Sequence, residues 1–219
     1  MYFFDMDGTV LDSNGIWADI DRRFLGRWGQ EFVPEDYSDF VTHHSFPEAA
    51  AYTRKRYGLP MTEEEIMDTW RGMAREAYAG QVALKPGVRD FLERAKGEGI
   101  RCAMLTSCLP DLCAIALEGH GLTGYFERIF TTQELLVDKR QPELYQKVAA
   151  ECGEKPEDCI FFEDSPVNCA AAAAAGWQVY GVEDRLFAAR RKEMEEACGA
   201  GHFPFSFLDP LPGHSADKK

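Results

Sequence analysis

The sequence predicts an α/β fold in which a Rossmann-like parallel sheet forms the core and an all-helical segment is inserted into it. Two observations support this fold class. Short continuous apolar runs alternate with helical patterns from residue 84 onward, as expected for parallel strands that are covered on both faces. Residues 14–83 show helical periodicity without convincing alternation, so we expect only helices there.

The first element is a short apolar strand over residues 1–4, which leads directly into the run Asp5-Met6-Asp7-Gly8-Thr9. An apolar run that stops at acidic residues and glycine is typical of a buried strand followed by a loop. Asp-Gly is also a common turn dipeptide, so this run alone indicates either a turn or a functional loop.

The inserted segment, residues 14–83, contains two clear helical patterns. The apolar residues of the first pattern share one helical face, and they are Ile16, Ile20, Phe24, Leu25 and Trp28. The second pattern begins at Thr62-Glu63-Glu64-Glu65, which has the form of a capping box. We expect Trp17, Trp28 and Trp70 to lie in the core of this segment.

Helical and strand patterns alternate in the rest of the chain. Lys85-Pro86-Gly87 opens a helix that Gly97 to Gly99 end. The further strand candidates are the apolar runs at residues 100–105, 128–130, 159–162, 177–182 and 203–208, of which the last is the weakest. The further helix candidates cover residues 110–118, 142–152, 169–175 and 184–197. We expect the tail from His214 to be frayed.

Composition and charge limit the compartment and the partners of the chain. The formal net charge of −13 repels nucleic acid and anionic membranes at long range, so we expect neither as a partner. The seven cysteines include no pair separated by two residues and are typical of buried thiols in a reducing compartment. Without a signal peptide or a membrane-spanning run, we expect a cytoplasmic protein that is monomeric, with a dimer as the alternative.

Polar residues follow three of the predicted strands. They are Asp5 and Asp7, Thr106 and Ser107, and Glu163 and Asp164. Ligands of open parallel sheets bind beyond the carboxyl ends of the strands. We therefore expect these side chains to meet in one site.

Four ordered motifs carry a resemblance that extends over nearly the whole chain. Asp5-Met6-Asp7-Gly8-Thr9 resembles the first motif of the haloacid dehalogenase-like (HAD) hydrolase superfamily, and Thr106 resembles its second. Lys139, followed by Pro142-Glu143 and Tyr145, resembles the third, and Glu163-Asp164-Ser165 resembles the fourth. The chain is most similar to the helical-cap subfamily that contains β-phosphoglucomutase and phosphoglycolate phosphatase.

The resemblance implies roles for the acidic residues. Asp5 is expected to be the nucleophile, and Asp7 is expected to act as general acid and then as general base. A Mg²⁺ cofactor is expected to bind a carboxylate oxygen of Asp5, the backbone carbonyl of Asp7, and Asp164. Glu163 would join this ligand set directly or through water, which suits the preference of Mg²⁺ for oxygen donors.

The resemblance also implies roles for Thr106 and Lys139. Thr106 would hydrogen-bond the phosphoryl oxygens, alongside backbone N–H groups of the following helix, and its alternative role is a helix N-cap. Lys139 would offset the negative charge of the nucleophile and the phosphate, and its alternative is an ordinary surface lysine. Arg140 stands where family members more often have proline, but the spacing to Pro142 favours Lys139 over Arg140.

The family's domain arrangement assigns residues 1–13 and 84–219 to the α/β core and residues 14–83 to a helical cap. The hinges would then lie near Ser13 to Gly15 and near Gly80 to Leu84. Arg54-Lys55-Arg56 is the densest basic cluster of the chain. We favour a solvated helix face for this cluster over contact with an anionic substrate.

The function implied by the resemblance is magnesium-dependent hydrolysis of a small phosphorylated metabolite through an aspartyl-phosphate intermediate. A sugar-phosphate mutase similar to β-phosphoglucomutase is the alternative, since it shares all four motifs. A non-catalytic binding or regulatory protein on the same fold is the second alternative, because a fold alone does not establish function. The sequence does not identify the substrate.

Overall fold

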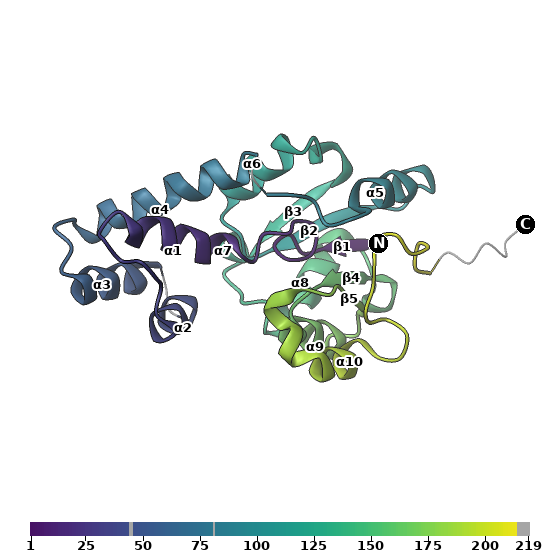
Figure 1. The fold of residues 1–219 in the computed structure, drawn as a ribbon. Helices are drawn as coiled ribbons and strands as arrows, with labels where there is room; N and C mark the ends of the chain where they lie inside the picture. Colours follow the sequence, from purple (N-terminus) through teal and green to yellow (C-terminus); the bar gives the residue numbers. More distant parts are fainter. Residues whose placement is uncertain (44–45, 81, 214–219) are drawn as a thin grey trace, which may run out of the picture. The chain divides into compact units, whose positions relative to one another are not determined.

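The computed structural model describes residues 1–43, 46–80 and 82–213, and the chain separates into two compact units (Figure 1). One unit consists of Met1–Asn14 and Val82–Lys219, and we call it the α/β unit. The other consists of Gly15–Gln81, and we call it the helical unit. The tail from His214, which we expected to be frayed, lies outside the described residues.

The α/β unit contains a five-stranded parallel sheet, which confirms the predicted fold class. Its strands are β1 (Tyr2–Phe4), β2 (Cys102–Thr106), β3 (Arg128–Thr131), β4 (Ile160–Glu163) and β5 (Gln178–Gly181). Their spatial order is β3-β2-β1-β4-β5. In the central strand β1, Phe3 is paired with Ala103 on one side and with Phe161 on the other. The strands are short apolar runs because both faces of the sheet are covered.

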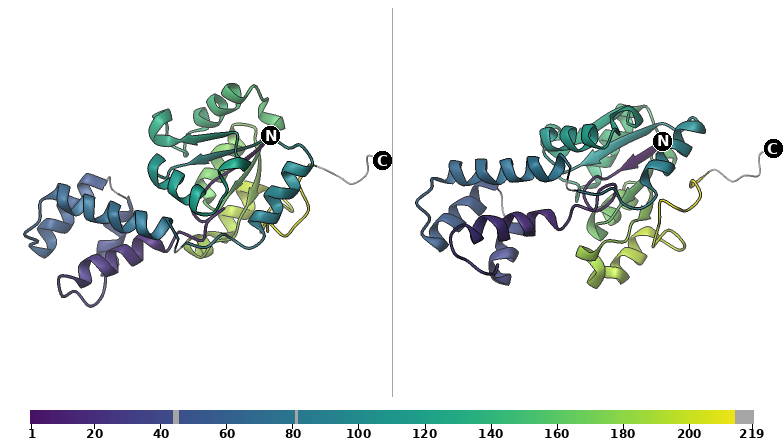
Figure 2. Two further views of the ribbon diagram at one scale, coloured as in Figure 1. Left: turned by 90° about the horizontal axis from the view of Figure 1, so that it is seen from above. Right: turned by 45° about the horizontal axis from the view of Figure 1, so that its top comes forward.

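Helices accompany the strands of the α/β unit in the predicted alternation (Figure 2). They are α5 (Val88–Gly97), α6 (Pro110–Gly119), α7 (Thr132–Leu135), α8 (Pro142–Cys152), α9 (Pro166–Ala174) and α10 (Arg191–Cys198). Single stretches of 3₁₀ helix cover Thr123–Tyr125, Pro156–Asp158 and Arg185–Arg190. Across residues 1–43, 46–80 and 82–213, no helix combines the length and the apolar character that crossing a bilayer requires.

The two faces of the sheet bury different clusters, because successive side chains of a strand point in opposite directions. On one face, Phe3 and Phe161 pack with residues of α8, α9 and α10, including Tyr145. On the other face, the ring of Phe4 stacks on that of Phe162, and both rings meet the edge of Phe91 from α5. The run of phenylalanines thus fixes the sheet between two layers.

The helical unit consists of α1 (Ile16–Gly26), α2 (Glu35–His43), α3 (Phe46–Tyr57) and α4 (Glu63–Tyr78). The predicted capping box at the start of α4 is confirmed, since the Thr62 hydroxyl accepts from the Glu65 N–H and the Glu65 carboxylate accepts from the Thr62 N–H. Trp70 is buried, as predicted, with its ring edge-on to Phe24 of α1.

Two tryptophans of the helical unit depart from the prediction. Trp17 is 39% exposed and Trp28 is 38% exposed, so neither belongs to the core. α1 ends at Gly26, which places Trp28 beyond the helix and off its apolar face. The expectation for Trp28 failed because helical periodicity was extended past the point where the helix stops. Trp17 lies within α1, at its second position, so this reason does not account for its exposure.

The C-terminal part of the chain also corrects the prediction at two places. Residues 203–208 do not form a strand, and only Phe205 makes an isolated bridge, to Val182. Pro204 has no N–H to donate to a ladder, which explains why regular pairing is not continued. The predicted helix over 184–197 is divided into the 3₁₀ stretch Arg185–Arg190 and the helix α10.

Candidate active site

The sheet topology defines where a ligand can bind. From β1 the chain proceeds to β2 and β3 on one side, and it then returns to form β4 and β5 on the other side. The strand order therefore reverses between β1 and β4, and open α/β sheets bind ligands beyond the carboxyl ends of the strands at such a point. Asp5 directly follows β1, Glu163 ends β4, and Asp164 follows it.

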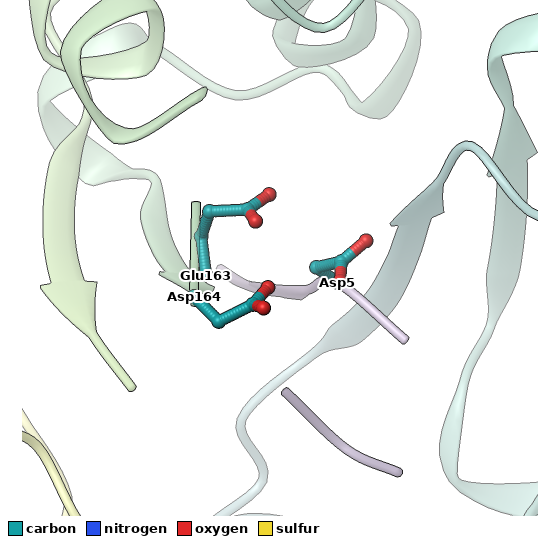
Figure 3. A group of neighbouring side chains, drawn as sticks. All are labelled: Asp5, Glu163 and Asp164. Carbon is teal, nitrogen blue, oxygen red and sulfur yellow. The ribbon is translucent and has the colours of Figure 1, made fainter. Parts of the chain in front are cut away.

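Three acidic side chains converge at this point (Figure 3). Carboxylate oxygens of Asp5, Glu163 and Asp164 all lie within 4.8 Å of one another. The three residues are 5%, 1% and 3% exposed, respectively. Burying a carboxylate is costly unless a positive charge, hydrogen bonds or protonation compensates it, so a cluster of three favours a nearby cation.

Lys139 supplies one positive charge to this cluster. Its Nζ lies 2.6 Å from Asp5 Oδ1 and 2.5 Å from Glu163 Oε2, and the residue is 3% exposed. The Tyr145 hydroxyl, from the first turns of α8, donates to the Lys139 carbonyl oxygen over 2.8 Å and so anchors the loop that carries the lysine. Arg140 points elsewhere, because its exposed guanidinium pairs with Asp138.

The electrostatics of the cluster follow from burial. Burial, together with the negative charges of Glu163 and Asp7, raises the pKa of Asp5 to about 8, although Lys139 opposes this. Burial and the charge of Glu163 likewise raise the pKa of Asp164 well above its usual range. Burial alone lowers the pKa of Lys139, but Asp5 and Glu163 outweigh burial and raise it overall. One ammonium group does not fully compensate three buried carboxylates.

Asp5, Glu163 and Asp164 could hold a metal ion. All three offer carboxylate oxygens, which are the donors that hard divalent cations prefer. Glu163 Oε1 accepts from the Ser165 N–H over 2.9 Å. Within the described residues, the buried Oε2 accepts no well-aligned hydrogen bond and meets only the ammonium of Lys139 as an ion partner. This acceptor and the excess negative charge both fit a bound cation.

Asp7 lies outside the buried cluster. It is half-buried, and its Oδ1 accepts from the Ser13 hydroxyl over 2.6 Å. Its carboxylate is not among the clustered ligand atoms of the described residues. From the sequence we expect Asp7 to approach a metal through its backbone carbonyl. That contact stays a prediction.

Thr106 is fully buried at the carboxyl end of β2. Its hydroxyl oxygen accepts from the Cys108 N–H over 3.0 Å. The alternative role as a helix N-cap is not seen, since α6 begins at Pro110 and its N-cap residue is Leu109. Contact between Thr106 and a phosphoryl group stays a prediction.

The basic cluster Arg54-Lys55-Arg56 lies on α3 of the helical unit. Arg56 makes a bidentate pair with Asp36, with distances of 2.7 and 3.0 Å, and its guanidinium lies over the rings of Tyr52 and Tyr57. Arg54 has a longer contact of 3.8 Å to Glu63. Arg56 therefore contributes to the packing of the helical unit through its contacts with Asp36, Tyr52 and Tyr57.

Sequence reasoning missed Asn14 and the residues around it. The Asn14 side-chain amide donates to Asp164 Oδ2 over 2.6 Å, and the Thr9 hydroxyl donates to Asp164 Oδ1 over 3.2 Å. Thr9 belongs to the first motif, but nothing in the sequence distinguishes Asn14 from an ordinary loop residue. Only the fold brings it to Asp164, which is 150 positions away.

Comparison with known proteins gives one family and several relatives. The sequence model of the haloacid dehalogenase-like hydrolases matches residues 1–176. Protein CbbY of Rhodobacter capsulatus is 28% identical over 80% of this chain and 82% of its own. A phosphorylated carbohydrates phosphatase of Thermotoga maritima is 28% identical over 84% of this chain and 85% of its own.

The fold has close structural counterparts as well. A Thermotoga maritima protein provisionally assigned as a β-phosphoglucomutase superimposes with a TM-score of 0.75, covering 91% of each chain at 24% sequence identity. At this level of identity, the likeness concerns the fold.

Proposed function

The chain belongs to the haloacid dehalogenase-like hydrolases, and from this we propose that it is a magnesium-dependent phosphatase acting on small phosphorylated metabolites. The observation that carries the proposal is the buried carboxylate of Asp5, which lies 2.6 Å from the ammonium of Lys139 and beside the carboxylates of Glu163 and Asp164. A nucleophilic carboxylate needs positive charge around it before it can approach an anionic phosphate.

Asp5 is the proposed nucleophile. One of its carboxylate oxygens attacks the phosphorus atom of the ester, the bond from phosphorus to the ester oxygen breaks, and an aspartyl-phosphate forms. Water then attacks the same phosphorus, the bond to Asp5 breaks, and inorganic phosphate leaves. Lys139 orients Asp5 and favours its carboxylate form, both before the attack and as the leaving group of the second step, because it pairs with Asp5 and Glu163 at once.

Asp7 is the proposed general acid and base. In the first step its carboxylic acid gives a proton to the departing alcohol oxygen, and in the second step its carboxylate takes a proton from the attacking water. Two features support this role. Asp7 is half-buried, whereas Asp5 is buried, so Asp7 can exchange protons with solvent. The Ser13 hydroxyl donates to its Oδ1 over 2.6 Å and orients the carboxyl group.

Asp5, Glu163 and Asp164 are the proposed side-chain ligands of Mg²⁺, together with the carbonyl oxygen of Asp7. When bound, this ion supplies positive charge that reduces the repulsion between Asp5 and the phosphoryl group. Thr106 and the N–H groups that follow it are proposed to hydrogen-bond the phosphoryl oxygens, since Thr106 ends the neighbouring strand β2.

The substrate class is proposed to be small phosphate esters such as sugar phosphates. The phosphorylated carbohydrates phosphatase of Thermotoga maritima supports this class by similarity. We also propose that the helical unit, Gly15–Gln81, serves as the cap that selects the substrate. Caps of this kind exclude water during the reaction.

The test is phosphate release from a panel of phosphorylated metabolites by the purified full-length protein, with and without Mg²⁺. Asp5→Asn is the control, because it preserves the volume of the side chain and removes the nucleophilic charge. We expect Mg²⁺-dependent release that this variant lowers by about 10⁴-fold or more. Circular dichroism confirms that the variant is folded.

The outcomes separate the candidate functions. Full activity in folded Asp5→Asn protein contradicts the assignment of the nucleophile. Conversion of one sugar phosphate into its isomer without net phosphate release indicates a mutase. No turnover of any substrate, in folded protein, favours a binding or regulatory role.

A further inference from the structure

Asn14 makes a direct contact with one of the proposed metal ligands. Its Nδ2 donates to Asp164 Oδ2 over 2.6 Å, while the Thr9 hydroxyl holds the other carboxylate oxygen over 3.2 Å. Each oxygen of Asp164 thus has one protein donor, and each retains acceptor capacity for a cation. Two donors on opposite oxygens leave the carboxyl group little freedom to rotate.

A second carboxylate, that of Asp184, lies near the amide of Asn14. The Asp184 carboxylate accepts from the Lys85 ammonium over 2.6 Å and from the Leu186 N–H over 2.9 Å, and with the nearby amide of Asn14 these donors hold the pKa of Asp184 below its usual value in spite of burial. Asp184 is itself buried, and its Oδ2 lies 2.6 Å from the ammonium of Lys85. The amide of Asn14 therefore donates to the proposed metal ligand on one side and has the Asp184–Lys85 ion pair as a neighbour.

The backbone passes closely beside this bridge. Gly8 has a φ of +82°, and a Cβ built there would lie 2.1 Å from both Asn14 Nδ2 and Asp164 Oδ2. A glycine is needed at this position for its conformation and for the close approach. The hydrogen bond between Asn14 and Asp164 is thus enclosed by the loop that carries Asp5 and Asp7.

We propose that Asn14 is a positioning residue that orients the carboxylate of Asp164 toward Asp5 and Glu163 for metal binding. The inference rests on the proposed metal site and goes beyond the residues that resemble family motifs. Groups that hold metal ligands in place typically contribute 10- to 100-fold to metal affinity. Asn14 is positioned for this contribution because its amide donates directly to Asp164 and the backbone of Gly8 packs closely against both groups.

The test is isothermal titration of the full-length, metal-free protein with MgCl₂ in the absence of substrate. Asn14→Ala removes the amide, and Gly15→Ala is the matched control, because a Cβ at Gly15 would meet no atom within 4 Å. We expect Asn14→Ala to raise the Mg²⁺ dissociation constant about 10- to 100-fold. Gly15→Ala should leave this constant unchanged.

A second readout separates positioning from a merely structural role. Saturating Mg²⁺ should restore most of the kcat of Asn14→Ala, and the melting temperature without metal should stay close to that of the unmodified protein. Asn14→Ser, which keeps a shorter donor, replaces Asn14→Ala in all measurements if the latter does not fold. A dissociation constant within about twofold of the Gly15→Ala value overturns the proposal.

Asp164→Ala distinguishes failure of the inference from failure of the site. If this variant binds Mg²⁺ as tightly as the unmodified protein, the proposed metal site is wrong and the inference falls with it. If Asp164→Ala loses affinity and Asn14→Ala does not, only the role of Asn14 is overturned. Weakened binding by Asn14→Ala supports the inference even where the metabolite panel shows no hydrolysis.

Discussion

Among the individual residues, Lys139 has the least ordinary environment for its type. Lysine is almost never fully buried unless it is paired, and here the ammonium lies within 2.6 Å of Asp5 and 2.5 Å of Glu163. Its side chain also approaches the ring of Phe161, at 5.3 Å from the ring centre. Removing this side chain leaves two buried carboxylates without their common partner.

We therefore expect Lys139→Ala to destabilise the metal-free protein by about 3–5 kcal/mol near neutral pH, the usual cost of breaking a buried ion pair. Arg140→Ala is the control, because Arg140 is exposed and its pair with Asp138 should contribute at most about 1 kcal/mol. Urea denaturation of the unmodified protein and of the two variants measures both losses of stability. An equally small loss of stability for the two variants would show that the pairing of Lys139 with Asp5 and Glu163 does not stabilise the metal-free protein.

Among the elements, the segment after α10 contributes to the core without regular structure. Phe205 and Phe207 are buried although residues 203–208 form no strand. Their rings lie against Phe91 and Phe162 with centroid distances between 4.9 and 5.7 Å. This segment closes one face of the sheet by ring packing and by the backbone hydrogen bond from the Phe205 N–H to the Gly181 carbonyl oxygen.

We expect Phe207→Ala to lower the free energy of unfolding by about 3–5 kcal/mol, as is typical when a buried phenylalanine is truncated. The neighbouring Leu208 is 67% exposed, so Leu208→Ala should change stability by no more than about 0.5 kcal/mol. Denaturation midpoints compared at a constant m-value provide the measurement. Similar losses for the two variants would contradict the prediction that buried Phe207 contributes more to stability than exposed Leu208.

At the scale of the whole molecule, the α/β unit gathers negative charge from distant parts of the chain into one buried site. A carboxyl group whose pKa is higher in the folded than in the unfolded state stabilises the fold most when it is protonated. Burial raises the pKa of Asp5 from 3.8 to about 8. The stability contributed by this group is therefore present at low pH and is lost as pH rises through about 8.

We expect the increase in melting temperature caused by Mg²⁺ to be larger at pH 8 than at pH 6. At the lower pH the ion must displace a proton from the site, whereas at the higher pH it neutralises charge that destabilises the metal-free protein. Thermal melts with and without MgCl₂ at both pH values test this. Asp5→Asn should reduce the difference, and an equal shift at the two pH values would contradict the prediction.

Local patterns predicted most of the fold correctly. The continuous apolar run before Asp5 and the run before Glu163 are neighbouring parallel strands, as expected for runs without alternation. The capping box at Thr62 marks the true start of α4. The errors at Trp28 and at residues 203–208 have a common cause, since in both places apolar residues were assigned to regular elements that do not extend so far.

The sequence by itself determined the parallel sheet and the acidic residues at the strand ends, because strand patterns and loop motifs are encoded by residues close together in the chain. The spacing to Pro142 favoured Lys139 over Arg140, but only the tertiary structure showed that the Lys139 ammonium pairs with Asp5 and that Asn14 reaches Asp164. Those contacts join positions 134 and 150 residues apart. No local sequence pattern predicts these two contacts, since they form only when the fold brings the loop after β1 next to Lys139 and to Asp164 after β4.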